Sequence, residues 1–241
     1  GTRGQFTGLN NWEQPLGQLH WFRAGTASDY RQANPFGIFV AWKNRRVAKL
    51  LQRAALGGLP VVERITLEAD FPVAELSFHD PDIPIDVKLL HFSPFIPRES
   101  RLSSLPVVIS VVRLRNPMEV PATVSVLACC LNVVGSWNVG RYNRIVRRGH
   151  LVGLECRRRH GDSRDARSGE LALVADAKDA EVTYLASWMF AKEPFRANEE
   201  DRRLEAWDSF AADGRLRNEA QSREAMGEFE INTPLRQAAF L

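Results

Sequence analysis

An alternating stretch in the middle of the chain constrains the fold more than any other feature: IDVKLLHFSPFIPRESRLSSLPVVISVVRLRNP, from Ile85 to Pro117. In its first part Val87, Leu89 and His91 fall on one face of an extended segment, with Asp86, Lys88 and Leu90 on the other. Its second part, around residues 107–112, is rich in β-branched residues, and Asn116-Pro117 ends it. The stretch therefore predicts two strands joined by a proline-rich loop.

The same kind of pattern recurs along the chain and predicts a mainly β protein. Further strands are expected at Phe36–Trp42, Val47–Gln52, Val61–Ala69, Val73–Phe78, Val120–Val134, Asn143–Val146, Leu151–Cys156, Leu171–Ala175 and Val182–Met189, with a short one starting at Phe229. One late helix is expected at Glu199–Ala211, with Asn198 as its N-cap and Gly214 just past its end. About ten short strands and one helix favour an antiparallel two-sheet β-sandwich, a single domain over residues 1–241.

Composition limits the classes of function. The net charge is +3, with 32 basic and 29 acidic residues, which favours neither nucleic acid nor a membrane surface as partner. The basic stretch from Arg141 to Arg167 is expected to be a solvent-exposed hairpin and loop. Three cysteines, two of them adjacent, suggest a reducing compartment, and we expect a cytoplasmic protein. No apolar run is long enough to predict a transmembrane segment, and residues 1–34 are expected to be irregular.

Several segments, in order, resemble one enzyme family. The resemblance is carried by the phrases SPFIP and SSLPV and by six further segments: Arg3–Pro15, Ala33–Val40, Phe78–Leu89, Tyr142–Glu155, Gly169–Trp188 and Ala206–Asn218. Together they are similar to the amino-terminal domain of glycoside hydrolase family 116, the family of non-lysosomal glucosylceramidases and bacterial β-glucosidases. The resemblance implies a β-sandwich that precedes a catalytic (α/α)6 barrel in a retaining β-glucosidase.

The resemblance also implies where the chemistry lies. The family's catalytic carboxylates belong to the barrel, which this chain lacks, so we expect a piece of a longer enzyme that is inactive alone. We expect the domain to support the barrel and its pocket, with a β-glucoside or glucosylated lipid bound through the barrel. A stand-alone carbohydrate-binding or protein-interaction module is the alternative, and an independent hydrolase that uses its own acids is a weaker one.

Few residues are candidates for a site. Trp12, Trp137 and Asn138 are predicted to lie at a domain interface or pocket rim, because sites often form where domains meet. Trp188 and Trp207 are expected in the core. The segment His79–Asp86, HDPDIPID, predicts an Asx-Pro turn rather than a metal loop. We assign no catalytic residue, metal ligand or cofactor-binding residue, since no nucleophile, phosphate-loop or dinucleotide motif occurs.

Overall fold

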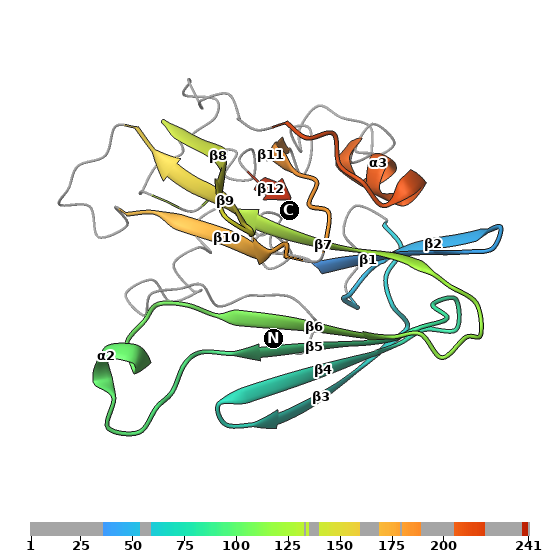
Figure 1. Ribbon diagram of the computed structural model, residues 1–241, viewed down its shortest axis with the longest axis horizontal. Coiled ribbons are helices and arrows are strands. Elements are labelled where there is room, and N and C mark those ends of the chain that lie inside the picture. The colour runs from blue at the N-terminus through green and yellow to red at the C-terminus, as the bar shows by residue number, and fades with distance from the viewer. Residues whose placement is uncertain are drawn as a thin grey trace, which may run out of the picture.

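The computed structural model describes residues 36–53, 59–132, 134, 140–159, 169–178, 180–188, 205–219 and 238–240 (Figure 1). Of these residues 53% are in strands and 8% in helices, and every strand pairing is antiparallel. The predicted mainly β class with one late helix is confirmed. The irregular segment 1–34, the N-cap Asn198 and the strand expected at Phe229 lie outside the described residues.

The alternating stretch Ile85–Pro117 forms two strands at one edge of a four-stranded sheet. The order is β3-β4-β5-β6, with β3 at Arg64–Asp70, β4 at Val73–His79, β5 at Asp86–Phe92 and β6 at Ile109–Arg115. Val87 pairs with Leu114, and Leu89 pairs with Val112. Since paired residues share a face, the predicted alternation places Val87 and Leu89 on the inner side, where both are buried.

A five-stranded sheet covers that inner side. Its order is β11-β12-β7-β1-β2, with β11 at Leu185–Trp188, β12 at Ala238–Phe240, β7 at Thr123–Leu131, β1 at Phe36–Trp42 and β2 at Arg45–Leu50. Ile38 and Val40 of β1 pack in one buried cluster with Leu76 of β4 and Leu89 of β5. These two sheets form the layers of the expected sandwich (Figure 1).

A third sheet departs from the two-sheet expectation. It has the order β10-β9-β8, with β8 at Arg141–Arg148, β9 at Leu151–Arg158 and β10 at Leu171–Asp176. Val152, Leu154 and Cys156 of β9 form a separate core with Cys130 of β7. Both faces of β7 are apolar because this strand contributes side chains to three hydrophobic cores. One core also contains residues of the late helix, one contains residues of the four-stranded sheet, and one contains residues of the three-stranded sheet.

The late helix, α3 at Glu205–Asp213, covers the face of the five-stranded sheet that is turned away from the four-stranded one. Trp207 and Phe210 pack there against Phe39 of β1, with the rings of Phe39 and Phe210 edge to face. The core position predicted for Trp207 is confirmed. Gly214 ends the helix with φ +78° and donates its N–H to the Phe210 carbonyl at 2.8 Å, so the predicted C-terminal glycine is also confirmed.

Candidate interaction surface

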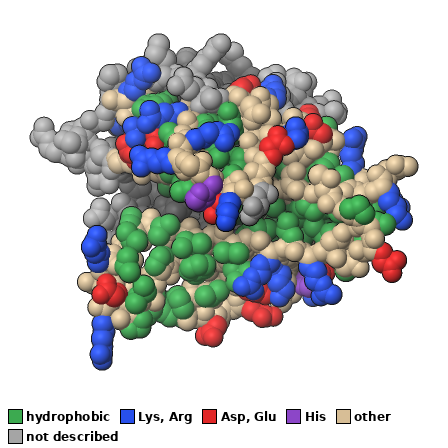
Figure 2. Space-filling view, viewed as in Figure 1, with side chains coloured by type: hydrophobic (Ala, Val, Ile, Leu, Met, Phe, Trp, Pro, Cys, Tyr) green, Lys and Arg blue, Asp and Glu red, His purple; other side chains and the backbone are tan. Residues whose placement is uncertain are grey.

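The residues predicted from sequence for a domain interface, Trp12, Trp137 and Asn138, lie outside the described residues, so that assignment stays a prediction. The structure instead reveals an apolar surface on the outer side of the four-stranded sheet. This apolar surface consists of Phe71, Val73, Phe95, Ile96, Leu102, Leu105, Val107, Ile109 and Val111, all of which are exposed. In Figure 2 hydrophobic side chains gather over the left half of this sheet and the loop beside it.

Strand register assembles the apolar surface from distant parts of the sequence. Val73 of β4 pairs with Phe92 of β5, which pairs in turn with Ile109 of β6, so the three share one row of the outer face. Phe71, in the turn between β3 and β4, is 77% exposed and lies edge to face against Phe95 with ring centroids 5.0 Å apart. Two segments 24 positions apart therefore meet in one aromatic pair.

The loop between β5 and β6 is held in a defined shape at this surface. Ser103 Oγ accepts the Ile96 N–H at 2.9 Å and donates to the Ile96 carbonyl at 3.0 Å. Ser103 ends the short helix α2, Ser100–Ser103, which carries the exposed Leu102. The serine that follows Leu102 thus ties the SPFIP and SSLP segments together, and both present apolar side chains to solvent.

Charged side chains border the apolar surface on the same face. Glu75 of β4 forms an ion pair with Lys88 of β5, and Arg113 of β6 lies 3.8 Å from the other oxygen of Glu75. Glu68 of β3 is paired directly opposite Glu75. The hydrogen bond that the Lys88 ammonium donates to Glu75 raises the pKa of Lys88 above its ordinary value. The combination of an apolar centre and a polar border is typical of protein interfaces.

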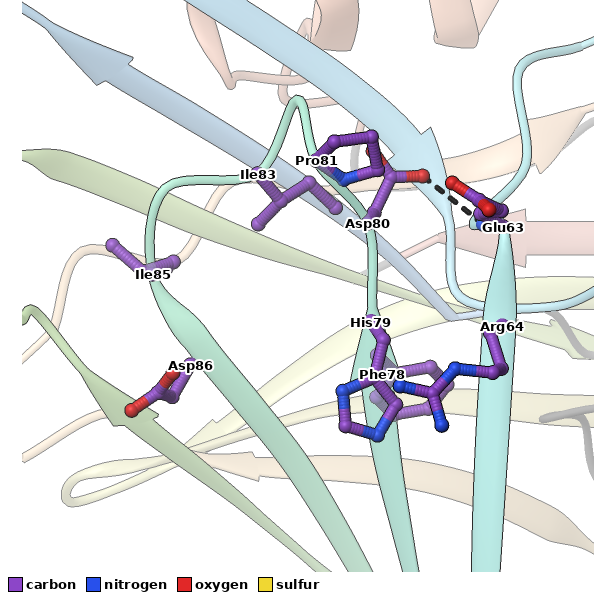
Figure 3. Close-up of a pocket in the computed structure, with 9 residues that line it drawn as sticks. All are labelled: Glu63, Arg64, Phe78, His79, Asp80, Pro81, Ile83, Ile85 and Asp86. Carbon is purple, nitrogen blue, oxygen red and sulfur yellow. Dashed lines mark hydrogen bonds between the residues drawn. The ribbon is translucent and has the colours of Figure 1, made fainter.

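A second feature is a pocket of about 330 Å³ at the opposite end of the sheet (Figure 3). Arg64 and Glu63 line one side, His79 and Asp80 another, and Asp86 a third, each from a different part of the sheet. Phe78, Ile83 and Ile85 form its apolar lining.

Asp80 anchors the turn beside this pocket. Its side chain is 1% exposed, and its Oδ1 accepts the Lys49 ammonium at 2.7 Å and the Asp82 N–H at 3.0 Å. Its Oδ2 accepts the Glu63 N–H at 3.0 Å. The bond to the N–H two residues on confirms the predicted Asx turn. Burial lowers the pKa of Lys49, but hydrogen bonds to Asp80 and Asp82 outweigh it, so the pKa is raised.

Several carboxylates in the described part of the chain form ion pairs with lysine or arginine. Lys49 binds Asp80, Lys88 binds Glu75, and Arg144 and Arg157 both bind Glu155, at 2.7 and 3.0 Å. Glu68 and Glu75 face each other, but on an open sheet face beside Lys88 rather than across a cleft. Glycoside hydrolysis needs two carboxylates on either side of a bound sugar, so we assign no catalytic pair among these residues.

His91 lies on the inner side of β5, on the same face as Val87 and Leu89. Its Nδ1 is hydrogen-bonded to Ser110 Oγ at 3.1 Å, and its ring lies 5.9 Å from that of Phe36. Burial lowers the pKa of His91 to about 4. The neutral imidazole thus packs between strands as a structural group.

The basic stretch forms the predicted hairpin of β8 and β9 around Gly149. Arg144, Glu155 and Arg157 share one ion-pair group that extends to Glu170, and Arg147 lies over the Tyr184 ring. Among the described residues, no cluster of three or more metal-ligating side chains occurs. Within the same part of the chain, no helix has the length and apolar character that crossing a membrane requires.

Comparison with known proteins adds one finding. A family model described as "beta-glucosidase 2, glycosyl-hydrolase family 116 N-term" matches residues 2–239. A search of curated proteins returned no match. The family match covers nearly the whole chain and includes the apolar surface, the Asp80 turn and the β8–β9 hairpin.

Proposed function

Because the chain belongs to the N-terminal domains of glycoside hydrolase family 116, we propose that it supports the catalytic barrel of a β-glucosidase or glucosylceramidase-like enzyme. In this role the domain is non-catalytic. It docks against the helical barrel, stabilises it and shapes its substrate pocket. The substrate, a β-glucoside or a glucosylated lipid, is bound through the barrel.

The apolar surface is the observation that carries this proposal. Phe71 is 77% and Phe95 53% exposed, and seven further hydrophobic side chains surround them. Contiguous apolar area of this kind costs free energy in water, and in soluble proteins it usually marks an interaction site. A domain whose partner is another domain of the same enzyme is expected to expose such a surface when it stands alone.

The ion pairs of the described carboxylates support the non-catalytic part of the proposal. A general acid or nucleophile must be free to reach a substrate. Asp80, Glu75 and Glu155 are each held by a lysine or arginine within the fold. These contacts support a stabilising role for the three carboxylates.

A reducing compartment is part of the same proposal. Cys129, Cys130 and Cys156 are all buried thiols. A hydrogen bond with Cys130, together with burial, raises the pKa of the Cys156 thiol, which favours the protonated form. Three buried cysteines that remain thiols are consistent with the cytoplasm.

The experiment compares the isolated chain with the chain supplemented by a separately produced barrel domain, assayed on an aryl β-glucoside. We expect no turnover from the chain alone, and more turnover from the mixture than from the barrel alone. The double variant Phe71→Asp/Phe95→Asp should lose this gain. Val174→Asp on β10 is the matched control, because Val174 is also exposed but lies on another sheet.

Three results would contradict the proposal. Turnover by the isolated chain that disappears when one of its own acids is replaced would show an independent hydrolase. Sugar binding by the chain alone, unchanged by the barrel, would favour a carbohydrate-binding module. Equal losses in the Val174→Asp and the double variant would remove the apolar surface from the docking argument.

A further inference from the structure

Among the strands that the structure describes, β6 is an edge of the four-stranded sheet. It pairs with β5 on one side, and no described strand pairs with it on the other. Its outer-face residues are Ile109, Val111, Arg113 and Arg115, and Val112 and Leu114 lie on the inner face. An edge strand presents a row of backbone N–H and C=O groups that can pair with another extended chain.

Of the two edge strands of this sheet, β6 has the sequence better suited to pair with an additional strand. β3, the opposite edge, carries Arg64, Glu68 and Asp70, so an incoming strand of either charge meets like charges. Mixed charges on an edge strand discourage pairing. In β6 the residues from Ile109 to Val112 carry no charge, and the remaining part carries only positive charge.

The two arginines of β6 are available to a ligand. The side chains of Arg113 and Arg115 are 62% and 79% exposed, and each lies 3.8 Å from its nearest carboxylate, on Glu75 and Asp86. Glu75 already has a closer partner in Lys88. Ion pairs this long on an exposed face contribute little, so both guanidinium groups can turn to a carboxylate on the open side.

We propose that β6 accepts an extended, acidic segment of a separate polypeptide as an additional antiparallel strand. Alternate side chains of that segment are carboxylates opposite Arg113 and Arg115. The side chains between them are apolar and meet Val112 and Leu114 on the inner face. Backbone hydrogen bonds supply the affinity, and the alternate side chains supply the specificity, as in other cases of strand addition. This inference goes beyond the proposed function. It uses the backbone edge of β6, whereas the docking surface uses the outer-face side chains of Ile109 and Val111 on the same strand.

A second copy of the chain fits the edge less well. Antiparallel pairing of two β6 strands centred on Val111 would place Arg113 opposite Ile109 and Arg115 opposite Val107. Both arginines would then face apolar side chains instead of carboxylates. Charge complementarity therefore favours an acidic partner strand over self-association.

The test measures binding of short fluorescent peptides to the 241-residue chain by anisotropy at low salt. One peptide alternates glutamate with valine, and a second has lysine in place of each glutamate. Two cross-strand charge pairs predict that the glutamate peptide binds about tenfold more tightly. In the variant Arg113→Glu/Arg115→Glu the preference should reverse, with the lysine peptide the tighter ligand.

Two controls separate strand addition from simple charge attraction. Arg98→Glu/Arg101→Glu makes the same change in net charge within the loop before β6, and it should keep the preference for glutamate. A glutamate peptide with alternate backbone nitrogens methylated cannot complete the hydrogen-bonded ladder, and it should not bind. Binding of the methylated peptide, no binding of the glutamate peptide, or a preference unchanged by reversal at Arg113 and Arg115 would each overturn the proposal. Concentration-dependent dimers lost in that same variant would assign the edge to a second copy instead.

Discussion

The variant Gly214→Ala tests how closely the end of α3 packs against the five-stranded sheet. Gly214 has φ +78°, a conformation that costs a non-glycine residue about 1–2 kcal/mol. A Cβ at this position would lie 2.5 Å from Ser125 Oγ and 2.7 Å from Phe39 Cδ1. Phe39 is buried against Phe210, so the ring cannot move away freely. Overpacking of a core costs about 1–3 kcal/mol, and the two effects together predict a loss of about 2–5 kcal/mol in the free energy of unfolding.

The matched control is Gly149→Ala. Gly149 has φ +60° but no atom within 4 Å of the added Cβ, so only the backbone cost of about 1–2 kcal/mol applies. Urea unfolding followed by tryptophan fluorescence measures both variants, with Trp207 on α3 as one reporter. The double variant Gly214→Ala/Ser125→Ala should recover part of the loss, because the nearest atom is removed. Equal stability of Gly214→Ala and Gly149→Ala would refute the steric reasoning.

Two further predictions concern buried polar groups. Asp80→Ala should lower the free energy of unfolding by about 2–4 kcal/mol, because it removes a buried acceptor of three hydrogen bonds. The control Asp82→Ala should cost less than about 1 kcal/mol, since Asp82 is exposed. Equal losses of the two variants in urea unfolding would contradict this explanation. The pKa of His91 is lowered from 6.5 to about 4, so the folded state favours the neutral ring, and stability should be lost as the pH falls below 6.5 towards 4. His91→Gln should make the free energy of unfolding less dependent on pH across that range. An unchanged slope in this variant would count against burial of the imidazole.

Local patterning predicted most strands because their side chains alternate against a core. Phe36–Trp42 begins and ends at the predicted residues. Elsewhere the boundaries moved by a few residues, as for β3, predicted from Val61 and observed from Arg64. Strand ends depend on which neighbouring strand supplies the hydrogen bonds, and that information is not local. The helix predicted at Glu199–Ala211 is observed at Glu205–Asp213, with residues 199–204 outside the described part of the chain.

The apolar surface illustrates what local patterns miss. Ile109 and Val111 read as ordinary strand residues, and the sequence predicts the alternation of β6 but not its exposure. Their exposure follows from β6 being an edge and from the outer face having no described covering layer. The pairing of Phe71 with Phe95 likewise needs β4 and β5 to be adjacent, which no periodicity states.

By itself the sequence determined the β class, the Asx turn at Asp80, the glycine that ends α3 and the family. Each depends on residues close together in the chain or on the order of short segments, which a sequence records directly. Only the tertiary structure decided that the described strands divide into three sheets, that Lys49 forms an ion pair with Asp80, and that β6 is an edge among these strands with two exposed arginines. These properties arise from register and layering between distant segments, and burial and charge pairing are fixed only when those segments meet.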